Sequence, residues 1–318
     1  KKGSGSRVMK VSWSEHYTMG IPEIDEDHKH LFRIAEKLVN TVESPNGMNE
    51  WSRMFVVREG VKYLKNYFLE HASREEEYMR RIGYADYVTH KRLHDEFQYV
   101  QMARFEEIIE RGNCSRDEVF DFVGVGIGWL LEHISTADMA IVGKGVLCSP
   151  RAEELNEKVL EQEVNMLFTA TLNLNLNARI INPDYGGEHF GDALCQQYIY
   201  QKDRQKIYIY SGIEKSFLIG VAKMVYGEDL GESEGLILST LEVFGANFWR
   251  TLGERLIQKN SGGIVYKENH FLSGKELRDI YAAKIPAVSV LFDSDMGKFF
   301  IASEDERWNR CFHKQPGA

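Results

Sequence analysis

The chain has 318 residues and a formal net charge of -9 at pH 7, from 48 acidic and 39 basic side chains. This length predicts two domains, and the acidic balance, without a long lysine or arginine cluster, argues against a nucleic-acid partner. No apolar run approaches the roughly 18 to 20 residues of a membrane helix, so we expect no membrane association.

The cysteines indicate the redox compartment. They are widely spaced and form no C-x-x-C pair, which is typical of reduced thiols rather than of a disulfide frame or a zinc site. We therefore expect a cytoplasmic protein. The opening KKGSGSRV, residues 1–8, is expected to be a remnant of cloning and is left out of the fold. The four cysteines are Cys114, Cys148, Cys195 and Cys311.

The first half of the chain predicts an up-down four-helix bundle over residues 9–143. Apolar residues recur at three- and four-residue spacing in four long segments, and short connections such as ESPNG, IGYA and GNCS make successive helices antiparallel neighbours. The predicted helices cover roughly residues 25–43, 51–81, 86–111 and 116–142.

The second half predicts a mixed α+β domain over residues 156–310, after a linker at 144–155 that contains GKGVLCSPR. A helix is expected at about 152–178, followed by the strands QQYIYQ and KIYIYS. Two more helices are expected near 215–227 and 232–258. The strands GGIVYKE, AVSVLF and GKFFIA complete the pattern.

Histidines recur on the inward faces of the predicted bundle. Residues four apart share a helix face, so His71 and Glu75 point the same way, as do His90 and His94. His90 and His94 lie on the same helix face as an apolar stripe that begins at Phe97. These side chains are therefore expected inside the bundle.

The first and fourth helices contribute in the same way. His28 is in register with Leu31, and His133 follows Trp129 by four residues. Asp138 comes five residues after His133, which is about 140° around an ideal helix, so we expect a wide turn or bulge between them.

Burying these groups without partners would cost several kcal/mol per charged group. A single buried histidine is more often simply hydrogen-bonded, but imidazoles and carboxylates from four helices predict a metal site. Carboxylates on facing helices hold paired metals in bundles. With Glu75, Asp138 and a solvent oxide or hydroxide bridging, five histidines divide as three and two, which leaves one coordination position open. The predicted ligands are His28, His71, Glu75, His90, His94, His133 and Asp138.

The order H…H-x-x-x-E…H-x-x-x-H…H-x-x-x-x-D, with WSEHYTMGIPEIDEDHKHLF and HASREEEYM, resembles the bacterial hemerythrins over residues 9–143. The resemblance implies a non-haem pair of iron ions that binds dioxygen reversibly. It implies that His28 and His71 serve the open iron and that His90, His94 and His133 serve the closed one. Glu75 and Asp138 would bridge the two irons.

Three smaller features near this site have a structural and a functional interpretation. The glycines of GVGIGW, Gly124 to Gly128, indicate tight helix packing, or room for a gas one turn before His133. Trp13 and Tyr17 are expected to cap the bundle end, with a place in the pocket as the alternative. REEEYMRR is expected to be a solvated face from which only Glu75 turns inward.

The second half resembles the chemotaxis phosphatases of the CheC, CheX and FliY group over roughly residues 156–304, through stretches such as STLEVFGANFWRTLG and IPAVSVLFDSDMGKFFIA. In that group a glutamate and an asparagine three residues apart on one exposed helix face release phosphate from a response regulator. Asn247 stands at the asparagine position, but Phe244 replaces the glutamate. The resemblance implies a catalytic Asn247, or a domain that binds a partner or dimerises as CheX members do.

Together the two halves predict an oxygen or redox sensor whose CheX-like output domain acts in chemotaxis or two-component signalling. The fourth bundle helix, the junction and the helix at 152–178 would transmit the signal as one continuous element. Expected partners are dioxygen, a CheY-like response regulator and a second copy bound through the C-terminal domain. The alternatives are an oxygen or iron store and an active response-regulator phosphatase.

Overall fold

The computed structural model describes residues 11–43, 49–148, 156–202, 204–226, 234–257 and 264–305. The chain divides into two compact units. The first comprises Lys1–Gly145 with Ala222–Gly245, and the second comprises Val146–Val221 with Ala246–Ala318.

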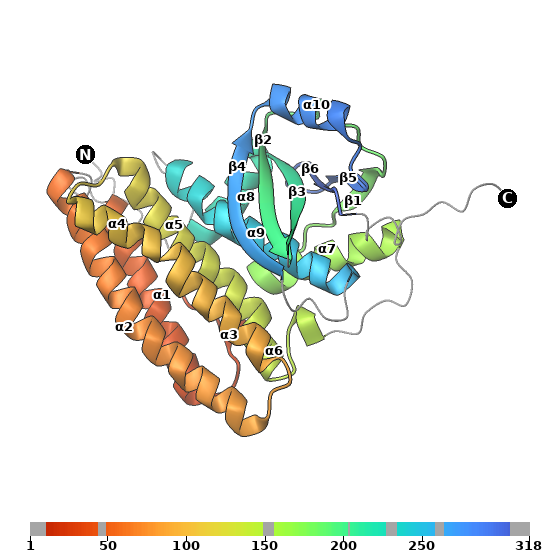
Figure 1. The fold of residues 1–318 in the computed structure, drawn as a ribbon. Coiled ribbons are helices and arrows are strands. Elements are labelled where there is room, and N and C mark those ends of the chain that lie inside the picture. Colours follow the sequence, from red (N-terminus) through yellow and green to blue (C-terminus); the bar gives the residue numbers. More distant parts are fainter. Residues whose placement is uncertain are drawn as a thin grey trace, which may run out of the picture. The chain divides into compact units, whose positions relative to one another are not determined.

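The first unit is built on the four long helical segments that the sequence predicts (Figure 1). A short 3-10 turn, η1 (Glu15–Tyr17), precedes α1 (Pro22–Glu43), and α2 (Glu50–Ile82) follows. The third segment is α3 (Tyr87–Glu96), a π-helical turn η2 (Phe97–Gln101) and α4 (Ala103–Arg111). The fourth is α5 (Arg116–His133), a second π-helical turn η3 (Ile134–Asp138) and α6 (Met139–Ile141).

Local sequence signals fix the ends of these helices. Asn49 caps α2 by accepting the Ser52 N–H, and Gly83 ends that helix in the left-handed region at φ 66°. Ser115 and Glu118 form a reciprocal capping box at the start of α5. The short connections predicted from IGYA and GNCS therefore lie at true helix ends.

The bundle core is a continuous apolar cluster between these helices. Val57, Phe105, Val119 and Phe122 are all fully buried. A side chain at Gly60 would collide with the ring of Phe122, so α2 carries a glycine where α5 approaches closely. This core holds the helices rigidly enough to position side chains on their inner faces.

The fourth helix ends just before the expected junction, and transmission through the helix, the junction and the helix at 152–178 stays a prediction. The helix ends at Ile141, and Gly143 and Gly145 then adopt φ values of 68° and 77°, which no α-helix accommodates. A 3-10 turn, η4 (Val146–Cys148), follows, and residues 149–155 of the predicted linker lie outside the described residues.

The second unit contains a six-stranded sheet in the order β1-β5-β6-β3-β2-β4, and each pairing between these strands is antiparallel (Figure 1). The five strands predicted from the sequence correspond to β2 (Ala193–Lys202), β3 (Gln205–Glu214), β4 (Ile264–Leu272), β5 (Val288–Asp293) and β6 (Phe299–Ser303). The short strand β1 (Arg179–Asn182) was not expected.

The helices of the second half agree less well with the sequence prediction than the strands do. α7 (Glu157–Leu172) stops six residues before the expected end, because Asn173 takes a left-handed φ of 54° and ends the helix. α8 (Lys215–Tyr226) and α9 (Glu234–Ile257) agree with the prediction. α10 (Gly274–Ala283) was missed, although Ser273 and Glu276 form the capping box that marks its start.

Both faces of the sheet are covered within the second unit. On one face Phe299 of β6 packs against Phe168 of α7 and Phe217 of α8. On the other face Leu277 and Tyr281 of α10 pack with residues of β2, β3, β5 and β6. The C-terminal half is therefore a helix-covered antiparallel sheet.

A buried ion pair ties this unit together. The Arg255 guanidinium of α9 contacts both carboxylate oxygens of Glu163 on α7, one of them at 2.8 Å, and also donates to the carbonyl of Val146. Its side chain is fully buried. Among the described residues, no helix combines the length and the apolar composition needed to cross a membrane.

We predict that Glu163→Gln destabilises the second unit by about 3 to 5 kcal/mol, because it leaves the Arg255 charge buried without a counter-charge. Hydrogen exchange of the β2 and β3 amides under mild denaturant measures this unit separately from the bundle. Glu157→Gln, at the exposed start of α7, is the matched control. Equal protection in both variants would contradict the prediction.

Candidate metal centre

The structure brings all seven predicted ligand side chains together in the bundle core. None is more than 3% exposed. They come from α1, α2, α3 and the α5–η3 segment, so each of the four helical segments contributes. The residues are His28, His71, Glu75, His90, His94, His133 and Asp138.

The π-helical turn η3 resolves the spacing of His133 and Asp138. The N–H of Met139 bonds to the carbonyl of Ile134 five residues back, which is the hydrogen-bond pattern of a π-turn. The turn takes up one residue more than an α-turn and returns Asp138 to the face of His133. The predicted wide turn is therefore confirmed.

The ligand atoms form two groups that share their carboxylates. One group contains three histidines and the other two, and both include Glu75 and Asp138. Within each group the ligand atoms lie within 4.8 Å of one another. This arrangement would let two cations sit side by side with both carboxylates between them.

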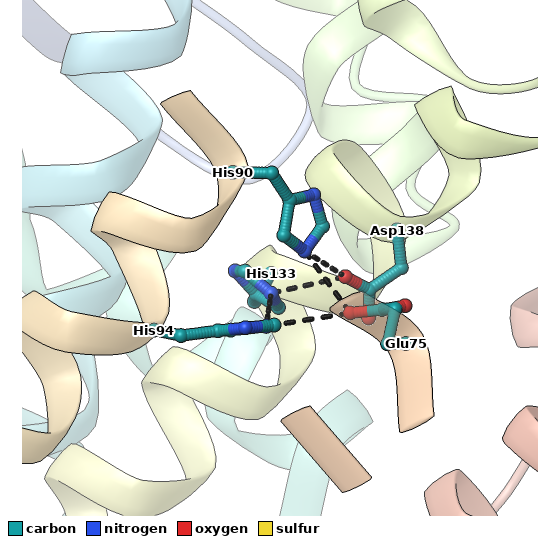
Figure 2. A group of neighbouring side chains, drawn as sticks. All are labelled: Glu75, His90, His94, His133 and Asp138. Atoms are coloured by element: carbon teal, nitrogen blue, oxygen red, sulfur yellow. Dashed lines mark hydrogen bonds and ion pairs between the residues drawn. The ribbon is translucent and has the colours of Figure 1, made fainter. Parts of the chain in front are cut away.

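Figure 2 shows the three-histidine group, whose imidazoles point toward Glu75 and Asp138. His90 Nε2 lies 3.0 Å from Glu75 Oε2, and His133 Nε2 lies 3.0 Å from Asp138 Oδ1. His94 Nε2 is 3.1 Å from His133 Nε2 and 3.3 Å from Glu75 Oε2. All three imidazoles thus turn their Nε2 atoms toward the same pair of carboxylate oxygens.

The two-histidine group lies on the other side of the carboxylates. His28 Nε2 approaches Asp138 Oδ2 at 3.1 Å, and His71 Nε2 is 4.0 Å from Glu75 Oε2. The two imidazole rings meet edge to face with centroids 4.8 Å apart. This group offers fewer protein donors than the first.

Several of these buried atoms have no hydrogen-bond partner. They are both nitrogens of His28, both carboxylate oxygens of Asp138, Glu75 Oε1, and Nδ1 of His71 and of His94. Although His28 Nε2 and Asp138 Oδ2 are close, the pair lacks hydrogen-bond geometry. Buried polar atoms normally find partners, so lone pairs converging without one fit a cation. Imidazole with carboxylate is a donor set that suits iron, manganese or zinc.

The electrostatics favour the forms that bind metals. Burial lowers the pKa of His71 to about 3 and the pKa of His133 to about 4. Burial acts to raise the pKa of Glu75 and of Asp138, but the surrounding imidazoles outweigh it and lower both. Neutral imidazoles and ionised carboxylates are the ligating species at neutral pH.

His28 and His94 behave differently. Burial acts to lower the pKa of His28, but the contact with Asp138 outweighs this and raises the pKa. The same holds for His94. Burial acts to lower its pKa, but the contacts with Glu75 and Glu76 outweigh this and raise the pKa to about 9. A cation bound at Nε2 of His94 would compete with a proton for that nitrogen.

Two carboxylates next to the histidines were missed by the sequence analysis. Glu76 Oε1 lies 3.5 Å from His94 Nδ1, and Asp27 Oδ2 lies 3.9 Å from His71 Nδ1. Arg74 also holds Asp27. Such groups orient a ligating imidazole through its second nitrogen. The expectation that only Glu75 turns inward from REEEYMRR is therefore wrong, since the Glu76 side chain is 15% exposed.

Trp13 lies beside the two-histidine group as well as at the bundle end. Its ring is 6.4 Å from that of His28 and 5.7 Å from that of Phe32, and it also contacts Tyr17. These aromatic rings shield His28 from solvent, which agrees with the alternative that placed them in the pocket.

Asn247, the residue assigned to phosphate release, lies in α9 and is 2% exposed. Its Oδ1 accepts a hydrogen bond from Arg250 at 2.6 Å. The phosphatase resemblance requires an exposed asparagine, and in this conformation the amide is buried and engaged. A catalytic role for Asn247 stays a prediction.

Comparison with known proteins agrees with this geometry. The family model of the hemerythrin HHE cation binding domain matches residues 19–144. Bacteriohemerythrin of Clostridium acetobutylicum is 32% identical over 127 residues, which cover 40% of this chain and 94% of that protein. Through this region the chain belongs to the hemerythrin family.

Hemerythrin-like proteins of Naegleria gruberi and Naegleria fowleri are each 26% identical over 136 residues, covering 43% of this chain and 92% of each relative. No solved structure matches the chain. The hemerythrin model ends at residue 144, so the likeness of the second half to chemotaxis phosphatases stays a prediction.

We predict that Asp138→Asn abolishes stable metal loading, because the amide removes a negative charge shared by both ligand groups. The metal affinity should fall by more than about 100-fold, since loss of a group that only orients a ligand already costs roughly 10- to 100-fold. Metal analysis after loading and gel filtration measures this.

Asp121→Asn, on the same helix and paired with Arg104, is the matched control. A normal helical circular-dichroism spectrum establishes that the Asp138 variant is folded. Full metal content in that variant would contradict the prediction.

Proposed function

We propose that the hemerythrin domain holds two non-haem iron ions and binds dioxygen. The observation that carries the proposal is the pair of ligand groups that share Glu75 and Asp138 in the bundle core. The matched family supports a cation at this place. A pair of ferrous ions, when bound, supplies the two electrons that reversible dioxygen binding requires.

The protein groups have distinct tasks in this proposal. His90, His94 and His133 would hold one iron, while His28 and His71 would hold the other with fewer protein donors. Glu75 and Asp138, which both groups share, would offset the charge of the two ions. Trp13 and its aromatic neighbours keep water away from the two-histidine side.

We further propose that the chain is an oxygen or redox sensor, with the second unit as a CheX-like output domain. The support is that one chain contains both the hemerythrin bundle and a second compact unit. A response regulator and a second copy of the chain are the proposed partners of that unit, and chemotaxis or two-component signalling is the proposed pathway.

We predict two irons per chain after anaerobic reconstitution, and a charge-transfer absorption band that appears on exposure to air and fades on removal of dioxygen. Metal analysis and absorption spectra of the whole protein measure both. The Asp138→Asn variant should show no such band. One iron per chain, or a spectrum indifferent to air, would contradict the iron-pair proposal.

The sensor proposal has its own test. We expect the dimerisation constant of the full chain, measured by sedimentation with and without dioxygen, to differ between the two states. Coupling requires that the ligand prefer one of two states of the output unit. An oxygen or iron store would instead show normal dioxygen binding and identical sedimentation with and without dioxygen.

The phosphatase alternative concerns Asn247. The burial of this residue and its bond with Arg250 weigh against it. A phosphorylated receiver protein incubated with the chain, with phosphate release followed over time, separates the alternatives. Release that is lost in Asn247→Ala favours the phosphatase.

A further inference from the structure

An apolar cavity of about 20 Å³, partly open to solvent, lies between the helices of the bundle. Its wall consists of leucine, isoleucine, valine, alanine, glycine, phenylalanine and tryptophan residues from all four helical segments. None of the seven candidate ligands lines it. It is therefore separate from the metal centre.

The cavity lies one helical turn from the ligands on every helix. Leu31 follows His28 by three residues, and Phe97 follows His94 by three. Phe68 precedes His71 by three, and Trp129 precedes His133 by four. At 1.5 Å rise per residue, these four wall residues form the layer of the bundle directly next to the ligand layer.

Aromatic rings form the boundary between cavity and ligands. The Phe68 ring is 5.6 Å from His94, and the Trp129 ring stacks on His133 at 4.2 Å. Trp129 also stacks on Phe97 at 4.2 Å. A molecule in the cavity would thus be one ring away from the imidazoles of the three-histidine group.

The three glycines of GVGIGW separate into two kinds. A Cβ at Gly124 would meet Ser239 Cβ at 2.6 Å, and a Cβ at Gly128 would overlap the Thr240 carbonyl, so close packing explains both. A Cβ at Gly126 would meet only Leu64 Cδ1 at 3.8 Å, which is ordinary contact. Gly126 faces the cavity instead, and packing does not require it.

The apolar wall of the cavity determines which kind of molecule it can bind. A volume of about 20 Å³ exceeds the roughly 10–15 Å³ that one water needs, but a water there would need two to four polar partners. The wall supplies apolar side chains, so it favours an apolar molecule over water. Dry apolar cavities in proteins bind xenon and other small apolar molecules.

We propose that this cavity binds one small apolar gas molecule and serves dioxygen as a holding site next to the metal centre. The proposal of a gas site rests on the cavity alone. The proposal that this site holds dioxygen rests on the proposed function. Gly126 is the residue that keeps the site open.

Xenon is the probe for the gas site. Crystals or ¹²⁹Xe spectra of the full chain, with and without iron, should show one xenon in this cavity. Gly126→Ala should lose it, while Gly253→Ala, a helical glycine with no atom within 4 Å of an added Cβ, should keep it. No xenon in the native chain, or equal xenon in Gly126→Ala, would overturn the site.

Val123→Ala gives an independent measurement should Gly126→Ala fold poorly. It removes two methyl groups from the wall and should increase xenon occupancy. Unchanged or reduced occupancy in a folded Val123→Ala chain would count against the cavity.

The role of the cavity in dioxygen binding is tested by mixing the iron-loaded, reduced chain rapidly with dissolved dioxygen and measuring the association rate. Gly126→Ala should slow association relative to Gly253→Ala and leave the final absorption spectrum unchanged. Unaltered association in a variant that has lost xenon would overturn the dioxygen role alone. If the native chain binds no iron, the proposed function is contradicted. The xenon measurement still tests the gas site in that case, because it does not require iron.

Discussion

The structure of the first unit depends on two carboxylates, Glu75 and Asp138, that lie fully buried between five imidazoles. Uncompensated, such charges would be among the most costly groups that a protein core can contain. Helices from four parts of the chain therefore have to converge at one level of the bundle. Capping at Asn49 and Ser115, and the π-turn before Met139, are the local means that bring them into register.

Much of this unit could be predicted from sequence because helical periodicity makes residues three and four apart neighbours. That rule places His90 with His94 and His71 with Glu75 without any knowledge of the fold. The rule fails for Asp27 and Glu76, because each lies next to the Nδ1 atom of a histidine on a different helix. Spacing within one helix cannot reveal such a contact. For GVGIGW the sequence offered both close packing and room for a gas, but it could not assign either to a particular glycine, because the residue type is the same in both cases.

The second unit was harder to predict for a different reason. Long strands such as β2 and β3 carry their own periodicity, but β1 is four residues long and pairs only through contacts distant in sequence. The helix α7 ends early because one asparagine adopts a left-handed conformation, which residue type permits but does not demand. The start of α10 did carry a signal, the Ser273 and Glu276 capping box, and the prediction overlooked it.

The left-handed glycines at 143 and 145 limit what the bundle can pass along the chain. An α-helix cannot run through these backbone angles, so the fourth helix does not continue as a helix across the boundary between the two units. The first residue beyond that boundary, Val146, accepts a hydrogen bond at its carbonyl from the buried Arg255. What joins the bundle to the second unit at this point is therefore an anchored turn of chain and not a lever.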